Sequence, residues 1–280
     1  MHQWLTRLPQ RQASPIPSAK TTTSPSLIDR RVVNPICIRQ ASFHRPSPVG
    51  SRRPPKSQLL VQTATIDDEE LDQAMNDPRA ALLEHNSGHW KGCFIRLGSS
   101  GNEEDRFPTL LEVQERDGVI ENCLTYVSSG EQRAMNFETV PFTMQVNASG
   151  CWSIGPSAIT PLAWVGELSV VHGDERRRVV ARHGFHGLDQ VVYIVETKAE
   201  KEPITPPPPL QCSTRESGPW VIWQPEPNVE LLLDARDRQM GDATACGLRW
   251  TNSNGQVHQI MRRYDANGYL ETLSDADIWG

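Results

Sequence analysis

After its first third, the chain consists of short runs in which apolar and polar residues alternate, separated by turn sequences. Alternation with a period of two is typical of β-strands that bury one face. The clearest run is Ala163–His172, in which Trp164, Gly166, Leu168 and Val170 fall on one side. The predicted strands cover Trp90–Leu97, Thr109–Gln114, Val119–Val127, Phe137–Val146, Cys151–Ile154, Ala163–His172, Arg176–Arg182, Gln190–Lys198, Trp220–Trp223, Val229–Ala235, Ala245–Thr251 and Gln256–Tyr264.

Glycine-rich and asparagine-rich turns join these runs. Asp117-Gly118 is a strong signal for a two-residue hairpin, and Gly98–Asn102 and Gly173–Glu175 are further turns. A proline-rich stretch near 203–210, with Pro206–Pro209 at its centre, predicts a loop or linker. Strands joined mostly by hairpins run antiparallel, so the pattern predicts an all-β domain that is either a closed barrel or a sandwich.

A short helix is predicted before the first strand. Asp67 or Asp68 is placed to cap it, and the helix then runs to about Leu83 with Leu71 on its apolar side. Pro78 lies within this range and predicts a break.

Charge divides the chain near residue 65. Residues 1–65 hold ten Lys and Arg and one acid, Asp29, whereas the whole chain holds 28 basic and 34 acidic residues. The remainder therefore holds 28 − 10 = 18 basic and 34 − 1 = 33 acidic residues, a net charge of −15 against +9 for the first segment. A basic segment rich in Ser, Thr and Pro is typical of a disordered organelle transit peptide, here of the chloroplast type. We therefore expect a plastid transit peptide over 1–65 and one β-barrel domain over 66–280.

Several classes of protein are disfavoured by the same composition. No apolar run reaches the roughly 20 residues of a membrane helix, and the first ten residues lack the apolar centre of a secretory signal. The acidic remainder argues against nucleic-acid binding, because phosphate contacts require clustered Lys and Arg. We expect a location in the chloroplast stroma or at the thylakoid surface.

The cysteines are far apart and form no C-x-x-C pair. Those that follow the basic segment are Cys93, Cys123, Cys151, Cys212 and Cys246. An odd, scattered set indicates buried free thiols in a reducing compartment, with a disulfide switch as the alternative.

Gly88-His89-Trp90 opens the first predicted strand after the short helix. This sequence resembles the Gly-x-Trp signature of lipocalins and the wider calycin superfamily. The resemblance implies an antiparallel calycin β-barrel in which Trp90 closes the barrel floor and an arginine of the last strand packs on its ring. The arginines that match this position are Arg262 and Arg263. A guanidinium over an indole gains about 0.5–2 kcal/mol from the cation–π interaction.

Further segments resemble an uncharacterised calycin-like family of cyanobacteria and plastids. They are Trp90–Leu97 with Pro108–Leu111, Gly150–Gly155 with Pro161–Ala163, and Glu175–Val180 with Leu188–Val191. The final stretch, Gln259–Gly268, is similar to the end of the S-type phycobilin lyases, which attach or chaperone linear tetrapyrroles. The resemblance implies a fold and an origin, and leaves the activity open.

Candidate ligand-binding residues are arginines and tryptophans on the predicted strands. A ligand carboxylate in a barrel requires an inward guanidinium, and large flat side chains line pockets for planar molecules. The candidates are Arg96, Arg182, Trp152, Trp164 and Trp250. The alternative for the tryptophans is that they fill the core. Arg176, Arg177 and Arg178 follow a tight turn, so we expect them to be solvated.

Other chemistry has weaker support in the sequence. His85 and His89 lie four residues apart and His183 and His186 three apart, but no third ligand recurs nearby, so no metal site is predicted. Gly-x-Ser-x-Gly and P-loop motifs are absent from the sequence. Three carboxylates interrupt apolar strands, namely Glu167, Glu196 and Asp234. They are candidates for acid–base catalysis, but outward-facing residues on half-exposed strands are the commoner explanation.

Three functions follow as hypotheses. The first is non-catalytic binding of a hydrophobic or tetrapyrrole-type molecule such as a bilin or porphyrin, and the sequence identifies no definite cofactor. The second is a lyase or isomerase that acts on such a chromophore. The third is a plastid assembly factor that contacts proteins through the barrel exterior and the loop near 203–210. A cavity inside the sheet would favour the first two, and a filled interior the third.

Overall fold

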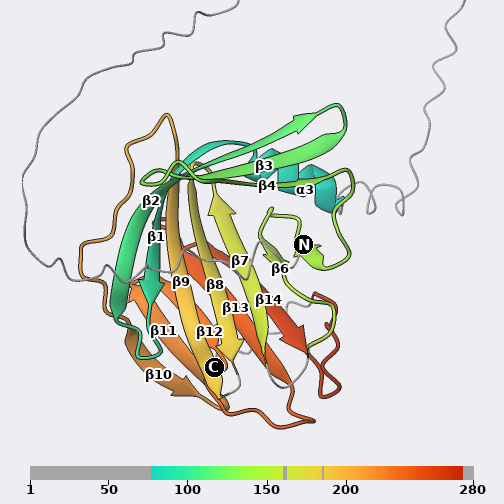
Figure 1. The fold of residues 1–280 in the computed structure, drawn as a ribbon, viewed down its shortest axis with the longest axis vertical. Helices are drawn as coiled ribbons and strands as arrows, with labels where there is room; N and C mark the ends of the chain where they lie inside the picture. Colours follow the sequence, from blue (N-terminus) through green and yellow to red (C-terminus); the bar gives the residue numbers. More distant parts are fainter. Residues whose placement is uncertain (1–76, 160–162, 185, 274–280) are drawn as a thin grey trace, which may run out of the picture. The chain divides into compact units, whose positions relative to one another are not determined.

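The computed structural model describes residues 77–159, 163–184 and 186–273 (Figure 1). The predicted transit peptide and the first part of the predicted helix lie outside the described residues. One α-helix, α3 (Pro78–Asn86), precedes the strands. The strands are β1 (Gly88–Leu97), β2 (Glu103–Arg116), β3 (Val119–Tyr126), β4 (Gln132–Phe137), β5 (Met144–Val146), β6 (Trp152–Ile154), β7 (Trp164–His172), β8 (Glu175–Gly184), β9 (Gly187–Lys198), β10 (Ser213–Ser217), β11 (Trp220–Glu226), β12 (Val229–Leu233), β13 (Thr244–Thr251) and β14 (Val257–Tyr264).

These strands form two antiparallel sheets. The first has nine strands in the order β4-β3-β2-β1-β9-β8-β7-β6-β5, and the second has five in the order β10 to β14. All pairs except β1–β9 join strands that are neighbours in sequence, which confirms the predicted hairpin connections. Because β9 pairs with β1, the strands β5 to β9 continue the sheet that β1 to β4 begin.

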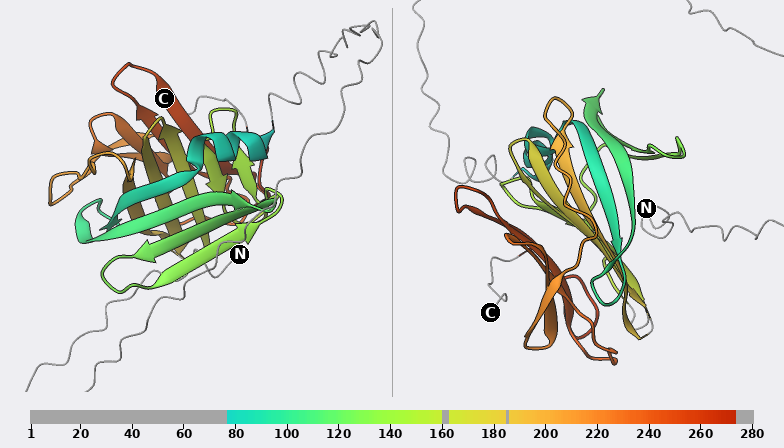
Figure 2. Two further views of the ribbon diagram at one scale, coloured as in Figure 1. Left: turned by 90° about the horizontal axis from the view of Figure 1, so that it is seen from above. Right: turned by 90° about the vertical axis from the view of Figure 1, so that its left-hand side faces the viewer.

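The nine-stranded sheet curls into a half-barrel, and Figure 2 shows the five-stranded sheet as a second layer. The all-β class and the short helix before β1 are confirmed. Within the described residues β4 and β5 stay at opposite edges of the sheet, so the strands do not close into the single cylinder expected from the sequence. The concave face holds an apolar cluster built around Trp90, Phe94, Ile120 and Leu124, with Leu82 of α3 packed on it.

The other face of the half-barrel packs against the five-stranded sheet. The core between the two sheets includes Ile95, Leu168 and Val179 from the first sheet and Leu231 and Leu248 from the second. Strands β7, β8 and β9 are therefore buried on both faces, which explains the long apolar stretches in β7 and β9. Strand β8 is also buried but carries several charged residues.

A buried polar contact ties the two layers together. Glu226 of β11 accepts hydrogen bonds from the Tyr193 hydroxyl of β9 and from Nε of Arg177 on β8, the latter at 3.0 Å. Both donors belong to one sheet and the acceptor to the other, so this contact fixes their register.

Most predicted strands are confirmed, with ends that shift by a few residues. The strand predicted over Phe137–Val146 is wrong, because Pro141 accepts a hydrogen bond from the Met144 backbone N–H and turns the chain between β4 and β5. Strand β10 was not predicted. Its five residues are polar and mostly exposed, since it lies at the edge of the second sheet, and so it has no apolar alternation to detect.

Helix α3 begins where the sequence predicted a break. Asp77 caps it by accepting a hydrogen bond from the Arg79 backbone N–H at 2.8 Å, and Pro78 occupies the first helical turn. A proline is well placed there, because that position needs no backbone donor.

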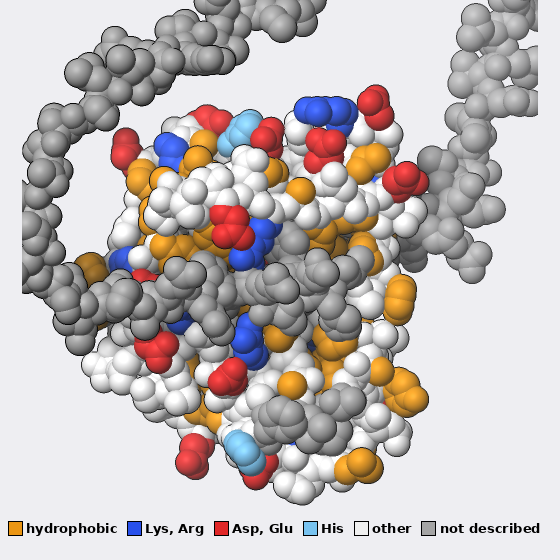
Figure 3. Space-filling view, in the orientation of Figure 1, with side chains coloured by type: hydrophobic (Ala, Val, Ile, Leu, Met, Phe, Trp, Pro, Cys, Tyr) orange, Lys and Arg blue, Asp and Glu red, His pale blue; other side chains and the backbone are white. Residues whose placement is uncertain are grey.

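The surface carries charges of both signs (Figure 3), and the described cysteines are unpaired. Acidic and basic side chains are interspersed on the face seen in Figure 3. No helix in the described part of the chain has the length and apolar character needed to cross a bilayer. The five described cysteines are free thiols, and all except Cys123 are buried, which agrees with the prediction for these residues.

Candidate functional site

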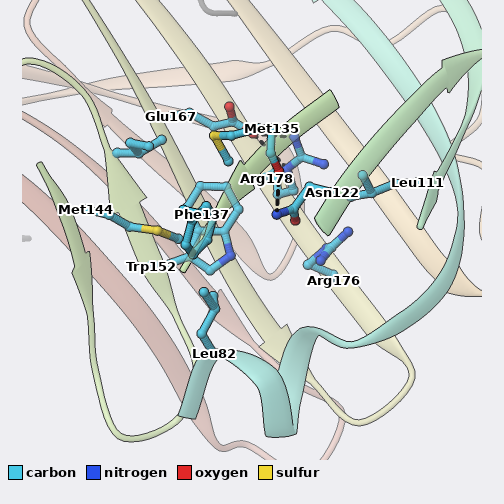
Figure 4. A pocket seen from close by; sticks show the side chains of 11 residues that line it. Leu82, Leu111, Asn122, Met135, Phe137, Met144, Trp152, Glu167, Arg176 and Arg178 are labelled. Atoms are coloured by element: carbon cyan, nitrogen blue, oxygen red, sulfur yellow. Dashed lines mark hydrogen bonds and ion pairs between the residues drawn. The ribbon is translucent and has the colours of Figure 1, made fainter. Parts of the chain in front are cut away.

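The concave face of the half-barrel encloses a cavity with apolar walls and a charged floor (Figure 4). It is lined by Leu82, Leu111, Asn122, Met135, Phe137, Met144, Trp152, Ile154, Glu167, Arg176 and Arg178. Its volume is about 40 Å³, which holds about three water molecules. Two of the lining side chains are flexible methionines on β4 and β5, the two edge strands, so the cavity has walls that a larger guest can displace.

The floor of the cavity is a network of four buried charges. Arg178 donates from Nε to Glu167 at 3.0 Å and from Nη1 to Glu196 at 2.9 Å. Arg176 donates from Nε to Glu196 at 2.7 Å. None of the four side chains is more than 3% exposed. We call Glu167, Arg176, Arg178 and Glu196 the buried quartet.

Strand register explains how the sequence assembles the quartet. Arg176 and Arg178 are two residues apart on β8, so both side chains point to the concave face. Glu196 of β9 lies directly opposite Arg176, and Glu167 of β7 lies diagonally across from Arg178, which pairs with Ser169. Opposite charges on neighbouring strands stabilise one another. Arg177 between them points to the other face.

Burial and charge shift the pKa values of this network in opposite ways. Burial lowers the pKa of Arg176, and the nearby Arg178 cation adds to the effect, although Glu196 opposes it. For Glu196 burial alone would raise the pKa, but the two guanidinium groups hold it below its usual value. Although burial opposes it, Glu167 and Glu196 raise the pKa of Arg178. Arg176 is therefore the arginine whose cationic form is less stabilised.

One donor of the quartet is unused. Arg176 Nη1 donates to Asn86 Oδ1 at 3.3 Å, but buried Nη2 finds no acceptor among the residues that the structure describes. Buried donors are nearly always hydrogen-bonded, so an unpaired one indicates a water molecule or a guest. The cavity is lined by this same side chain.

Asn86, the last residue of α3, connects the helix to this floor. Its backbone carbonyl accepts from Trp90 Nε1 at 2.9 Å, and its side-chain Oδ1 accepts from Trp152 Nε1 at 3.2 Å. Its Nδ2 donates to Gly150 O at 2.9 Å. The helix thus holds two cavity-side indoles and one arginine through a single residue.

Trp90 is buried as predicted, but other cations cover its ring. Arg176 Cζ lies 4.2 Å from the ring centroid and Lys198 Nζ 5.0 Å. Arg262 is buried elsewhere, where it donates to the Tyr264 hydroxyl at 2.7 Å and to Pro156 O at 2.7 Å. Arg263 pairs with Glu271 at 3.1 Å near the surface. Gly88 precedes Trp90 with a φ of +119°, a conformation that favours glycine.

The five predicted ligand residues do not meet at one place. Trp152 lines the cavity, whereas Trp164 and Trp250 lie in the core between the sheets. Arg96 of β1 lies 3.9 Å from Asp105, and Arg182 is half-buried on β8.

Residues that sequence reasoning placed in solvent form the site instead. The expectations that Arg176–Arg178 are solvated and that Glu167, Glu196 and Asp234 face outward are wrong, because all six are buried. The sequence did contain a signal for these buried charges, because each acid interrupts an apolar strand. The turn at Gly173-Asp174 then sets the register that brings Glu167 of β7 close to Arg178 of β8.

Metal binding has no support in this geometry. Across 77–159, 163–184 and 186–273, His, Cys, Asp and Glu side chains form no group of three or more suited to a metal ion. The acids of the quartet are engaged by arginine, so the arrangement favours binding through a donor over proton transfer.

Comparison with known proteins finds a family model and a solved structure that resemble the chain. Residues 75–201 match the family described as "Domain of unknown function (DUF3598), N-terminal". A crystal structure of a DUF3598 protein of unknown function from Nostoc punctiforme has a TM-score of 0.56 and 17% identity, and covers 70% of this chain and 96% of its own. No curated protein matches the chain. The likeness to calycins and phycobilin lyases stays a prediction. The chain is thus similar to DUF3598 proteins in sequence over residues 75–201, and it shares the fold of a solved structure from that family.

Proposed function

We propose that the chain is a binding protein for an apolar molecule that carries a carboxylate, and that the cavity of the half-barrel is its site. The observation that carries this proposal is the unused Nη2 donor of Arg176 beneath apolar walls. A ligand of this kind places its apolar part against Leu111, Phe137 and Trp152, and its acceptor on the guanidinium.

Charge around the floor favours an anionic head group. The quartet carries two positive and two negative charges, and the half-buried Lys198 adds a third cation 5.0 Å from the centroid of the Trp90 ring. Positive charge thus exceeds negative charge by one among these five groups. One ligand carboxylate would balance it and would form a charge-assisted hydrogen bond.

The small volume restricts the shape of the ligand. In this conformation the cavity of about 40 Å³ is narrower than a typical ligand pocket. Binding therefore requires the side chains of Met135 and Met144 to move. A slender acyl chain requires a smaller movement than a bilin does. Both ligand types carry carboxylates and remain within the proposal. We further infer that the half-barrel is of the calycin type, because Gly-x-Trp opens β1 and a cation covers Trp90.

Titration of the full chain with palmitate, its methyl ester and a linear tetrapyrrole tests this function. We expect Trp fluorescence to change saturably with the acid, since Trp152 lines the cavity, and the ester to bind about tenfold more weakly. Binding of the tetrapyrrole would identify the larger ligand, and a covalent adduct of the tetrapyrrole on an added apoprotein would favour the lyase. Equal affinity for acid and ester, or no saturable change with any probe, contradicts the proposal.

Arg176→Lys provides the matching change in the protein. It keeps the positive charge but removes the fork that carries Nη2, so we expect the acid to bind about tenfold more weakly while the ester is unaffected. Arg215→Lys on exposed β10 is the control and should leave both affinities unchanged. Isothermal titration calorimetry measures the four affinities. A loss that is equal for acid and ester would show that Arg176 acts only on the shape of the cavity.

A further inference from the structure

A second hollow lies between the two sheets, on the opposite side of β8 from the cavity. It is lined by the turn between β7 and β8, the chain after β9, the turn before β12 and the turn after β13. Its volume is about 560 Å³, within the range of small-molecule sites. The alternation of β8 separates the two hollows, because Arg177 lines this one while Arg176 and Arg178 line the cavity.

An unpaired donor lies at the wall of this cleft. Trp250 is 3% exposed, and its Nε1 has no acceptor in the described part of the chain. A buried indole N–H usually finds a partner. By comparison, the indoles of Trp90 and Trp152 both donate to Asn86.

The aromatic ring of Trp250 is held in place from several sides. Arg177 Cζ lies 4.9 Å from its ring centroid, and the rings of His258 and His172 lie at 5.9 Å and 6.3 Å. His172 also lines the cleft. The donor is therefore fixed in direction, which is the condition for a specific site.

The charges of the cleft disfavour an anionic ligand. Lys201 lies 3.4 Å from Asp174, and Arg177 lies 3.6 Å from Glu175 and also binds Glu226. Among the lining residues, three acids, Asp174, Glu175 and Glu202, face two permanent cations. No cation of the lining is left without a carboxylate, in contrast to Arg176 in the cavity.

Donors and acceptors both line the cleft. Trp250, whose N–H is unpaired among the described residues, lines it together with the carboxylates of Asp174 and Glu202, which are acceptors, and the Ser253 hydroxyl and His172 ring, which can donate or accept. A ligand hydroxyl can donate and accept at once, so several adjacent hydroxyls match this mixture better than an anion or an apolar chain does. We propose that the cleft binds a neutral polyhydroxylated molecule, of the size of a mono- or disaccharide.

Indole N–H resonances of the full chain labelled with ¹⁵N test this proposal residue by residue. Titration with maltose, sucrose and galactose should move the Trp250 resonance with at least one of them, and leave Trp90 and Trp152 in place. Palmitate should instead move Trp152, so failure of one proposal is distinguishable from failure of the other.

Trp250→Phe removes the donor and keeps an aromatic ring. We expect it to weaken saccharide binding about five- to tenfold, the effect of one buried hydrogen bond, and to leave palmitate binding unchanged. Trp152→Phe is the matched control with the reverse pattern. A Trp250 resonance that no saccharide moves, or that inorganic phosphate moves instead, overturns the proposal. Wild-type saccharide affinity in Trp250→Phe also overturns it.

Discussion

Glu196→Gln is expected to lower the free energy of unfolding by about 3–5 kcal/mol, the usual cost of breaking a buried ion pair from one side. Glu196 accepts hydrogen bonds from both arginines of the quartet and is fully buried. Glutamine has the same shape but no charge, and its amide group turns a donor toward one guanidinium. The variant leaves two buried cations with Glu167 as their only quartet acid. Urea unfolding of wild type and variant at pH 7 measures the difference.

Two further variants separate the effect of charge from that of packing. Glu112→Gln on β2 removes a carboxylate that is 42% exposed and 4.0 Å from His89, so it should change the stability by less than about 0.5 kcal/mol. Replacing Arg176 by Met in addition to Glu196→Leu removes both partners of a pair. This double variant should be more stable than Glu196→Gln, because no half of that pair stays buried alone. If Glu196→Gln unfolds like the wild type, the quartet is not a buried charge network.

Acid is expected to destabilise the protein through His183 well before the carboxylates titrate. Burial between the sheets lowers the pKa of His183 from 6.5 to about 3, with nearby Arg238 adding to the effect and Asp234 opposing it. Its ring stacks on the Trp164 ring, with the two centroids 4.1 Å apart. The unfolded chain binds a proton below pH 6.5 while the folded chain does not. Stability is therefore complete above pH 6.5 and falls as the pH drops toward 3, by on the order of 4 kcal/mol in total.

The window between pH 6.5 and 4.5 separates this histidine from Glu196, whose pKa lies below the usual value for glutamate. Over these two pH units we expect a loss of about 2 kcal/mol in the wild type. His183→Phe keeps a flat ring against Trp164 and should remove most of the slope. His186→Gln, an exposed neighbour, should retain it. Urea unfolding across this range checks all three proteins, and an unchanged slope in His183→Phe contradicts the assignment.

Local signals in the sequence were sufficient to predict most of the secondary structure. Asp117-Gly118 has positive φ at both residues and forms the predicted hairpin between β2 and β3. Where a segment lacks such a signal the prediction is wrong, as at Pro141, or absent, as at β10. Both segments lie at sheet edges, where few neighbours constrain the pattern.

The residues that line the cavity were predicted only in part. Trp152 was identified, but the arginines that form the floor were placed in solvent. A polar residue in a strand reads as an outward-facing one, because alternation alone assumes that a single face is buried. Strands β7 to β9 are buried on both faces, so their charged residues had to be paired inside.

By itself, the amino-acid sequence determined the all-β class, the hairpin order and a buried Trp90 behind a short helix, because alternation and turn residues act over a few neighbouring positions. Only the tertiary structure decided that there are two sheets, that Arg176 instead of Arg262 covers Trp90, and that one guanidinium nitrogen under the cavity lacks a partner. These properties depend on which strands meet across the fold. The energy of a buried charge is set by neighbours that are 11 to 90 residues away in the chain, among them Asn86, Glu167 and Glu196.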